Sequence, residues 1–280
     1  MIEIFKIIII GIVEGITEWL PISSTGHMLL LDAVMPLAMS PAFKEMFFVV
    51  IQFGAILAVV VMYWSRMWPF GIQVKQRETA NASKKIYIKT DIFFMWLKVI
   101  VALIPSVVFG LLLNDWLEAH LYTPVVIALM LIFYGLLFII IEKWHKNHTP
   151  KFETLSNLSW KTAFFIGMFQ VLAMIPGTSR SGATIIGGLL LGASRTVAAE
   201  FTFFLAVPTM LGASILKLAK FGLAFSSSEF VTLIVGMVVA FFVSLLAIKF
   251  LMGYIKKHDF TAFGWYRIVL GIIVLLVSFI

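Results

Sequence analysis

Eight apolar segments alternate with short polar stretches along the chain, and six of them have the length of a single membrane crossing. A spanning helix needs about 20 apolar residues. Segments of about this length occupy 42–64, 92–113, 121–141, 197–216, 230–252 and 264–280. The pattern therefore predicts six transmembrane helices.

The other two apolar segments, 1–31 and 161–193, are too long for one span and too short for two. Pro21 and Pro176 interrupt them near the middle, each beside small and hydroxyl-bearing residues. Backbone that leaves the helix at membrane depth is tolerated only where protein or a water-filled cavity satisfies its amides. We therefore predict two re-entrant helical hairpins whose broken tips line a pocket.

An internal repeat indicates that the two hairpins enter from opposite faces. The segment 20–24 (LPISS) matches 175–179 (IPGTS), and a long apolar segment follows each of them. Inverted repeats with broken helices that meet near the bilayer midplane are a common membrane architecture. We expect one all-α membrane domain over residues 1–280, with repeat 1 at about 1–141 and repeat 2 at about 161–280.

Composition supports an integral membrane protein. Of the 280 residues, 61% are hydrophobic and 12% are charged, whereas soluble domains carry about 25% charged residues. The chain has no cysteine, which excludes disulfides, thiolate metal sites and a cysteine nucleophile. The bilayer is the expected partner, and the sequence leaves open whether two copies form a homodimer.

The basic residues predict an orientation. With 65–91 in the cytoplasm, the predicted topology also places the basic loops at 143–161 and 256–257 on that side, following the positive-inside rule. Both termini then face outward. We therefore read the net charge of +7 as a sign of orientation and expect no nucleic-acid partner. The opposite side carries Lys44, Lys217 and Lys220 beside Asp32, Asp115, Glu118 and Glu229.

Two acids stand out inside the first apolar segment. Glu14 and Glu18 are four residues apart, so on a helix their carboxylates share one face and repel each other unless something lies between them. Two oxygen ligands suit a hard divalent cation, Mg²⁺ or Ca²⁺, which commonly binds one or two carboxylates together with substrate phosphate. A structural hydrogen-bond network and a proton relay are the alternatives, and the spacing does not choose among the three.

Hydroxyl groups and a histidine follow Pro21. Ser23, Ser24 and Thr25 come first, and His27 lies three residues after Ser24. The imidazole of a neighbouring histidine can activate a serine nucleophile. A serine that caps the helix after the proline is an equally good reading, and Ser23 is the candidate for that cap.

The second broken segment carries a cation. Arg180 lies between Ser179 and Ser181 at the predicted start of a helix, preceded by Gly177 and Thr178. A helix N-terminus offers free amides, and a guanidinium matches phosphate oxygens, so this segment predicts an anion site. Arg180 can also neutralise one of the two acids across the hairpins before substrate binds. A nucleotide P-loop is excluded because its lysine is missing.

Other polar residues are less specific. Glu45, Gln52, Arg195 and Glu200 lie in or beside predicted spans. Helix-end ion pairs or hydrogen bonds between helices explain them as well as a supporting role in a site does.

The motifs resemble those of the bacterial undecaprenyl-diphosphatases, also known as bacitracin-resistance proteins. The resemblance lies in EGxxE at 14–18, followed by PISSTGH at 21–27 and PGTSRSG at 176–182, and it covers essentially the whole chain. It implies an inner-membrane phosphoric anhydride hydrolase that converts undecaprenyl diphosphate into the monophosphate and inorganic phosphate. That reaction recycles the lipid carrier of peptidoglycan and other cell-wall polymers, and the resemblance implies an active site open to the periplasm.

The resemblance also implies roles for individual residues. Glu14 and Glu18 would bind metal and diphosphate, Ser24 would be the nucleophile, His27 its catalytic partner and Arg180 the phosphate clamp. Attack by His27 or by a metal-bound water remains open. The supporting donors to substrate would be Ser23, Thr25, Gly177, Thr178, Ser179 and Ser181.

Two other functions compete with this reading. Membrane phosphatases of the phosphatidic-acid type have a histidine six residues after the arginine of their SR motif, but Ile186 occupies that position here. A polyprenyl-phosphate transporter or flippase is the main alternative, because inverted repeats with broken helices also serve alternating access.

Overall fold

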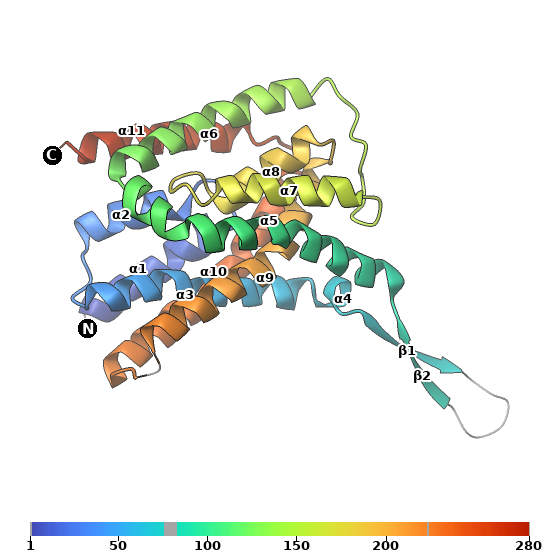
Figure 1. Cartoon of the computed structure of the whole chain (residues 1–280), viewed down its shortest axis with the longest axis horizontal. Coiled ribbons are helices and arrows are strands. Elements are labelled where there is room, and N and C mark those ends of the chain that lie inside the picture. Colours follow the sequence, from blue (N-terminus) through green and yellow to red (C-terminus); the bar gives the residue numbers. More distant parts are fainter. Residues whose placement is uncertain (1, 76–82, 223, 280) are drawn as a thin grey trace.

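The computed structural model describes residues 2–75, 83–222 and 224–279, which form eleven helices and one two-stranded β hairpin (Figure 1). The first half contains α1 (Ile2–Thr17), α2 (Ser24–Val34), α3 (Pro41–Met62), α4 (Trp64–Met67), β1 (Phe70–Lys75), β2 (Ser83–Ile88), α5 (Thr90–Leu121) and α6 (Pro124–His145). The second half contains α7 (Trp160–Leu172), α8 (Arg180–Leu190), α9 (Arg195–Phe221), α10 (Ser227–Tyr254) and α11 (Thr261–Val277).

Five of these helices are long and apolar enough to cross a membrane: α3, α5, α6, α9 and α10. They confirm a helical protein that passes through a membrane several times. α11 is equally apolar but has 17 residues, which is short for a span. α5 has 32 residues and continues to Leu121, eight residues beyond the predicted span 92–113.

The all-α fold is confirmed, and one connection between helices additionally contains a β hairpin. Strands β1 and β2 pair antiparallel between α4 and α5, with Phe70 opposite Ile88. Their sequences, FGIQVK and SKKIYI, contain the β-branched and aromatic residues that favour strands. The hairpin projects from one end of the helical bundle (Figure 1).

Both interrupted segments form a helix, a short break and a second helix that returns beside the first. We call the breaks the first tip, residues 18–23 between α1 and α2, and the second tip, residues 173–179 between α7 and α8. The pair α1–α2 comes from the end of the bundle where the chain starts, and α7–α8 comes from the end that carries the β hairpin (Figure 1). The two tips therefore point toward each other inside the bundle.

Helices of the two halves pack against one another. α1 lies on α10 and α7 lies on α5, while α3 packs against α9 and α6 against α11. Two of these contacts require glycine: a Cβ atom on Gly15 would lie 2.8 Å from the carbonyl oxygen of Ala240, and one on Gly167 would collide with the backbone of Ala102. The close packing fixes the depth at which each tip lies.

Ion pairs join helix ends of the two halves. Glu45 near the start of α3 pairs with Lys217 near the end of α9, and Glu200 near the start of α9 pairs with Arg66 in α4. The reading of these residues as helix-end partners is therefore confirmed. Arg195 at the start of α9 binds Glu142 near the end of α6 in the same way.

Candidate active site

Glu18 links the two tips. The Nη2 and Nε atoms of Arg180 lie 3.0 and 3.3 Å from its Oε1 atom, and the hydroxyl of Ser24 donates to its Oε2 atom at 3.2 Å. The Glu18 residue is 7% exposed. Acid and guanidinium therefore meet from distant parts of the sequence, as the two-hairpin interpretation requires, and the partner of Arg180 is Glu18.

Arg180 is held in place on three sides. It is the first residue of α8, and its Nη1 atom donates to the carbonyl of Thr202 at 3.1 Å. The guanidinium carbon lies 5.8 Å from the ring centroid of Trp19, within the range of a cation–π interaction. Its charge is thus aimed at the first tip.

Glu14 is the more deeply buried acid and has a free oxygen. It is 1% exposed, and its Oε1 atom has no hydrogen-bond partner. Gln52 of α3 lies beside the carboxyl group. A carboxylate oxygen without a partner in a buried site is a ready position for a cation or a water molecule.

His27 points away from Ser24. Its Nδ1 atom donates to the carbonyl of Ser23 at 2.8 Å, which leaves Nε2 of the neutral ring to accept from the hydroxyl of Tyr266 at 2.7 Å. The imidazole also stacks on the Tyr266 ring, with 5.6 Å between centroids. Among the hydrogen bonds of the described residues, the hydroxyl of Ser24 therefore pairs with Glu18 and not with His27. Thr25 lies half-buried in the first turn of the same helix.

The second tip and the first turn of α8 bring three hydroxyl groups to the site. The Oγ atom of Ser179 accepts the Gly182 amide at 3.1 Å and lies 3.2 Å from Oγ of Ser181. Ser181 in turn donates to the backbone carbonyl of Glu18 at 3.1 Å. Thr178 is fully buried, and its hydroxyl has no partner.

Gly177 allows the second tip to pass close to α6. Its φ angle is 88°, and a Cβ atom there would lie 2.5 Å from the carbonyl oxygen of Ile127. A side chain at this position would both strain the backbone and strike a neighbouring helix. Gly177 therefore allows the backbone of the second tip to turn beside α6.

The two tips share an unusual backbone conformation. Ser23 and Ser179 occupy the N-cap positions of α2 and α8, both with φ of 71°, and they are the non-glycine residues with positive φ in the described chain. Conformations of this kind cost about 1–3 kcal/mol and gather at functional sites. By cap position Ser23 corresponds to Ser179, so the register predicted from LPISS and IPGTS is off by one residue. Ser23 also makes no capping hydrogen bond through its side chain.

Sequence reasoning missed the residue that binds both tips, Arg267 of α11. It is 0% exposed, and it donates to the carbonyls of Pro21 at 3.2 Å and of Gly177 and Thr178 at 2.8 Å each. A lone arginine inside the apolar segment 264–280 was a usable signal, because a charge within a membrane segment marks a functional or structural centre.

The unsatisfied polar atoms of the molecule gather here. In the part of the chain that the structure describes, five buried side-chain atoms have no partner: Oε1 of Glu14, Nε1 of Trp19, Oγ of Ser23, Oγ1 of Thr178 and Nε of Arg267. All five belong to the tips, to α1 just before the first tip, or to the arginine that joins the tips. Buried polar groups are normally paired, so this concentration indicates a site that water or a polar ligand completes.

Comparisons with known proteins agree with this picture. The sequence matches the family model of BacA, described as bacitracin resistance protein BacA, over residues 7–273. A relative from Enterococcus faecalis named undecaprenyl-diphosphatase is 65% identical over 99% of this chain and 98% of its own. Relatives of the same name from Desulfitobacterium hafniense and Latilactobacillus sakei are 58% and 55% identical, over 99% and 98% of this chain and 96% and 97% of their own.

Proposed function

The chain belongs to the BacA family of bacitracin resistance proteins, and from that membership and the geometry of the tips we propose that it hydrolyses undecaprenyl diphosphate. The products are undecaprenyl phosphate and inorganic phosphate. The reaction returns the lipid carrier to the synthesis of peptidoglycan and other cell-wall polymers, and it gives resistance to bacitracin. The observation that carries the proposal is the placement of Glu18 between Arg180 and Ser24.

Arg180 binds the diphosphate in this proposal. A guanidinium offers several N–H donors in a fork that fits phosphate oxygens, and Arg180 already uses two of its nitrogens on the Glu18 carboxylate. An incoming phosphate replaces the carboxylate as the acceptor. Charge develops on the phosphoryl oxygens in the transition state, so a fixed cation there lowers the barrier. Further hydroxyl and amide donors come from the tips and the first turns of α2 and α8: Ser23, Thr25, Gly177, Thr178, Ser179 and Ser181.

Ser24 is the nucleophile we favour. Its oxygen attacks the terminal phosphorus, its proton passes to the Oε2 atom of Glu18, and the bond from phosphorus to the bridging oxygen breaks. Undecaprenyl phosphate leaves, and water then hydrolyses the phosphoserine to release inorganic phosphate. The 3.2 Å hydrogen bond from Ser24 to Glu18 supports this direction of proton transfer. Attack by His27 is the alternative, with its ring oriented by Tyr266.

Glu14 and Glu18 fit a divalent cation that shares its ligands with substrate. The free Oε1 atom of buried Glu14 is an available oxygen ligand. Among the described residues no group of three or more acidic, histidine or cysteine side chains is placed to hold a metal ion, so the ion would take its other ligands from phosphate and water. Magnesium or calcium bound there would neutralise charge on the phosphate oxygens.

We further propose that the fold is an inverted repeat with six spans and two re-entrant hairpins. The paired contacts support it: α1 packs on α10 as α7 packs on α5, and α3 packs on α9. The helix-end pairs Glu45–Lys217 and Glu200–Arg66 follow the same relation. α11 would be the sixth span, since it lies beside α6 over its length (Figure 1). Whether two copies form a homodimer remains an open prediction.

The proposed location is the bacterial inner membrane, with the active site open to the periplasm. The start of α1 and the end of α11 lie at the end of the bundle opposite the β hairpin (Figure 1). The described parts of the basic connections, 65–75, 83–91 and 143–161, lie at the hairpin end, which the positive-inside rule assigns to the cytoplasm. The polyprenyl tail stays in the bilayer while the diphosphate enters between the helices.

Release of phosphate by protein in detergent tests the activity. No membrane has to be crossed there, so turnover of undecaprenyl diphosphate shows an enzyme, whereas binding without release favours a polyprenyl-phosphate transporter. Arg66→Ala is a matched control for variants of Arg180, because Arg66 also pairs with a buried glutamate but lies at a helix end. Absence of phosphate release from well-folded protein with added magnesium or calcium would refute the proposal.

A further inference from the structure

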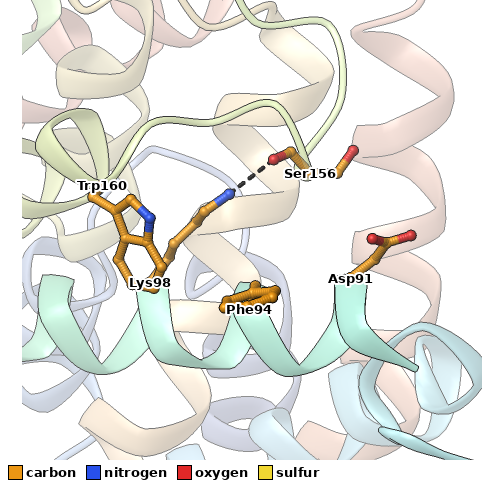
Figure 2. Close-up of a pocket in the computed structure, with 5 residues that line it drawn as sticks. All are labelled: Asp91, Phe94, Lys98, Ser156 and Trp160. Carbon is orange, nitrogen blue, oxygen red and sulfur yellow. Dashed lines mark hydrogen bonds between the residues drawn. The ribbon is translucent and has the colours of Figure 1, made fainter. Parts of the chain in front are cut away.

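A second polar site lies at the β-hairpin end of the bundle. A shallow pocket of about 270 Å³ is lined by Asp91, Phe94 and Lys98 of α5, by Ser156 in the connection before α7, and by Trp160, the first residue of α7 (Figure 2). α7 has 13 residues, which at 1.5 Å per residue separates this pocket from the second tip by about 20 Å. The pocket is therefore distinct from the proposed active site.

Lys98 carries a buried positive charge with little compensation. The residue is 6% exposed, its Nζ atom donates to the carbonyl of Ser156 at 2.8 Å, and it lies 5.9 Å from the ring centroid of Trp160. An ammonium group has three N–H donors, and in the described chain Lys98 makes no ion pair with a carboxylate. Burial of a charge without a counter-charge is costly, so an anion bound beside Lys98 would stabilise this arrangement.

Asp91 places the opposite charge across the same pocket. It precedes Lys98 by seven residues, so both side chains lie on one face of α5, with Phe94 between them (Figure 2). Asp91 also makes no ion pair among the described residues. The pocket thus offers a cation and an anion that face a common space without forming an ion pair.

Trp160 lines the pocket beside Lys98. Figure 2 shows its indole nitrogen on the edge that faces Lys98, and this N–H has no acceptor among the hydrogen bonds of the described residues. Its ring also contacts Phe94 edge to face, with 6.4 Å between centroids. Tryptophan is the residue type that lies at the boundary between acyl chains and headgroups.

We propose that this pocket binds the headgroup of a zwitterionic phospholipid, a phosphate ester that carries a primary amine. The phosphate accepts from Lys98 and from the indole of Trp160, and the ammonium donates to Asp91. An anionic phospholipid such as phosphatidylglycerol offers the phosphate without an ammonium, so it would leave Asp91 unpaired beside a negative charge, which disfavours it. The acyl chains follow the packed pair α5 and α7 into the bilayer. This inference is independent of the proposed hydrolysis.

Native mass spectrometry of the full chain in detergent tests the site with lipids of identical acyl chains. We expect phosphatidylethanolamine to bind more tightly than phosphatidylglycerol or phosphatidylcholine. Lys98→Gln, which keeps a donor for the Ser156 carbonyl, should weaken phosphatidylethanolamine by about tenfold. Lys161→Gln removes an exposed cation next to Trp160 and is the matched control, with unchanged binding expected.

Asp91→Asn tests the other charge of the pocket. This variant should bind both lipids but lose the preference for phosphatidylethanolamine over phosphatidylglycerol. Trp160→Phe keeps the ring, removes the N–H donor and should weaken binding by about threefold. Equal binding by Lys98→Gln and the unmodified chain, or a preference unchanged in Asp91→Asn, would overturn the proposal. Binding of soluble glycerophosphoethanolamine as tightly as the lipid would overturn the assignment to a membrane lipid.

Discussion

The two broken helices share a backbone design and differ in the chemistry that they carry. Each second helix starts after a serine with φ of 71°, Ser23 or Ser179, and backbone carbonyls of both tips accept hydrogen bonds from the same side chain, Arg267. The residue after the cap is Ser24 in the first and Arg180 in the second. Equivalent positions thus present a hydroxyl group, our proposed nucleophile, on one side and a cation on the other.

The contrast extends into the helices before the tips. Glu14 precedes Ser23 by nine residues, and Gln170 precedes Ser179 by nine. Gln170 is satisfied, since its amide donates to Ser106 at 2.8 Å and to Thr209 at 3.3 Å, whereas Glu14 keeps an oxygen without a partner. The two matching positions therefore differ in what they can bind: Gln170 is satisfied within the protein, whereas Glu14 keeps an oxygen free for a ligand.

Replacement of Arg180 should have the largest effect on activity. Arg180→Ala leaves Glu18 without its guanidinium and leaves the developing phosphoryl charge uncompensated, so we expect activity to fall by about 10³-fold. Arg180→Lys keeps the charge but loses the fork and should recover about a tenth of the activity. The measurement is phosphate release from undecaprenyl diphosphate in detergent. Near-normal turnover by Arg180→Ala at unchanged folding would remove Arg180 from the mechanism.

Loss of the Ser24 hydroxyl, at the start of α2, should have the second largest effect on activity. Ser24→Ala should reduce turnover by at least about 10²-fold, because it removes the attacking oxygen. In the unmodified chain, acid quenching during turnover followed by peptide mass spectrometry should detect phosphate on Ser24. Thr25→Ala removes a supporting donor from the same turn and should cost less activity than Ser24→Ala. Full activity of Ser24→Ala would exclude Ser24 as the nucleophile and leave attack by His27 or by water.

Much of this site was accessible from the sequence, because charges in apolar segments and proline breaks are local signals. They predicted both breaks and the pairing of Arg180 with one of the two acids, Glu14 or Glu18. Contacts between distant segments were not accessible: Tyr266 binds His27 across 239 positions, and Arg267 reaches both tips. The spacing of Ser24 and His27 was misleading, because the imidazole bonds back to the carbonyl four residues earlier.

Two further features needed the structure. The second tip is one residue longer than the first, and the extra residue shifts the register that the matched motifs suggested. The β hairpin in 65–91 was hidden because strands that pair only with each other depend on a contact that composition does not reveal.

Substitutions of Arg267 test whether activity requires one side chain to bind both tips. Arg267→Ala leaves three carbonyls of the tips without their donor, so we expect a lower melting temperature and about a 10- to 100-fold loss of kcat. Arg267→Lys supplies a charge with fewer directed donors and should restore part of kcat with little change in KM. A variant that melts earlier but keeps full kcat would limit Arg267 to folding.

An exchange of the acid and the amide sharpens the comparison between the halves. Glu14→Gln gives α1 the residue that α7 has, and we expect the concentration of magnesium or calcium for half-maximal activity to rise by about tenfold. Gln170→Glu should destabilise the protein, because its present hydrogen bonds to Ser106 and Thr209 favour an amide, but should leave the metal requirement unchanged. Activity titrations with each ion measure both. Equal metal requirements in Glu14→Gln and the unmodified chain would exclude Glu14 as a ligand.

The smallest effect concerns the strained caps. Ser23→Gly relieves a positive φ without loss of a capping hydrogen bond, so it should raise the free energy of unfolding by about 1 kcal/mol. Ser179→Gly relieves the same strain but loses the bond from the Gly182 amide, and the two terms should nearly cancel. Thermal unfolding in one detergent compares the pair. If both variants gained the same stability, the capping hydrogen bond of Ser179 would contribute nothing to the free energy of unfolding. If neither variant gained stability, the positive φ of the two serines would carry no strain.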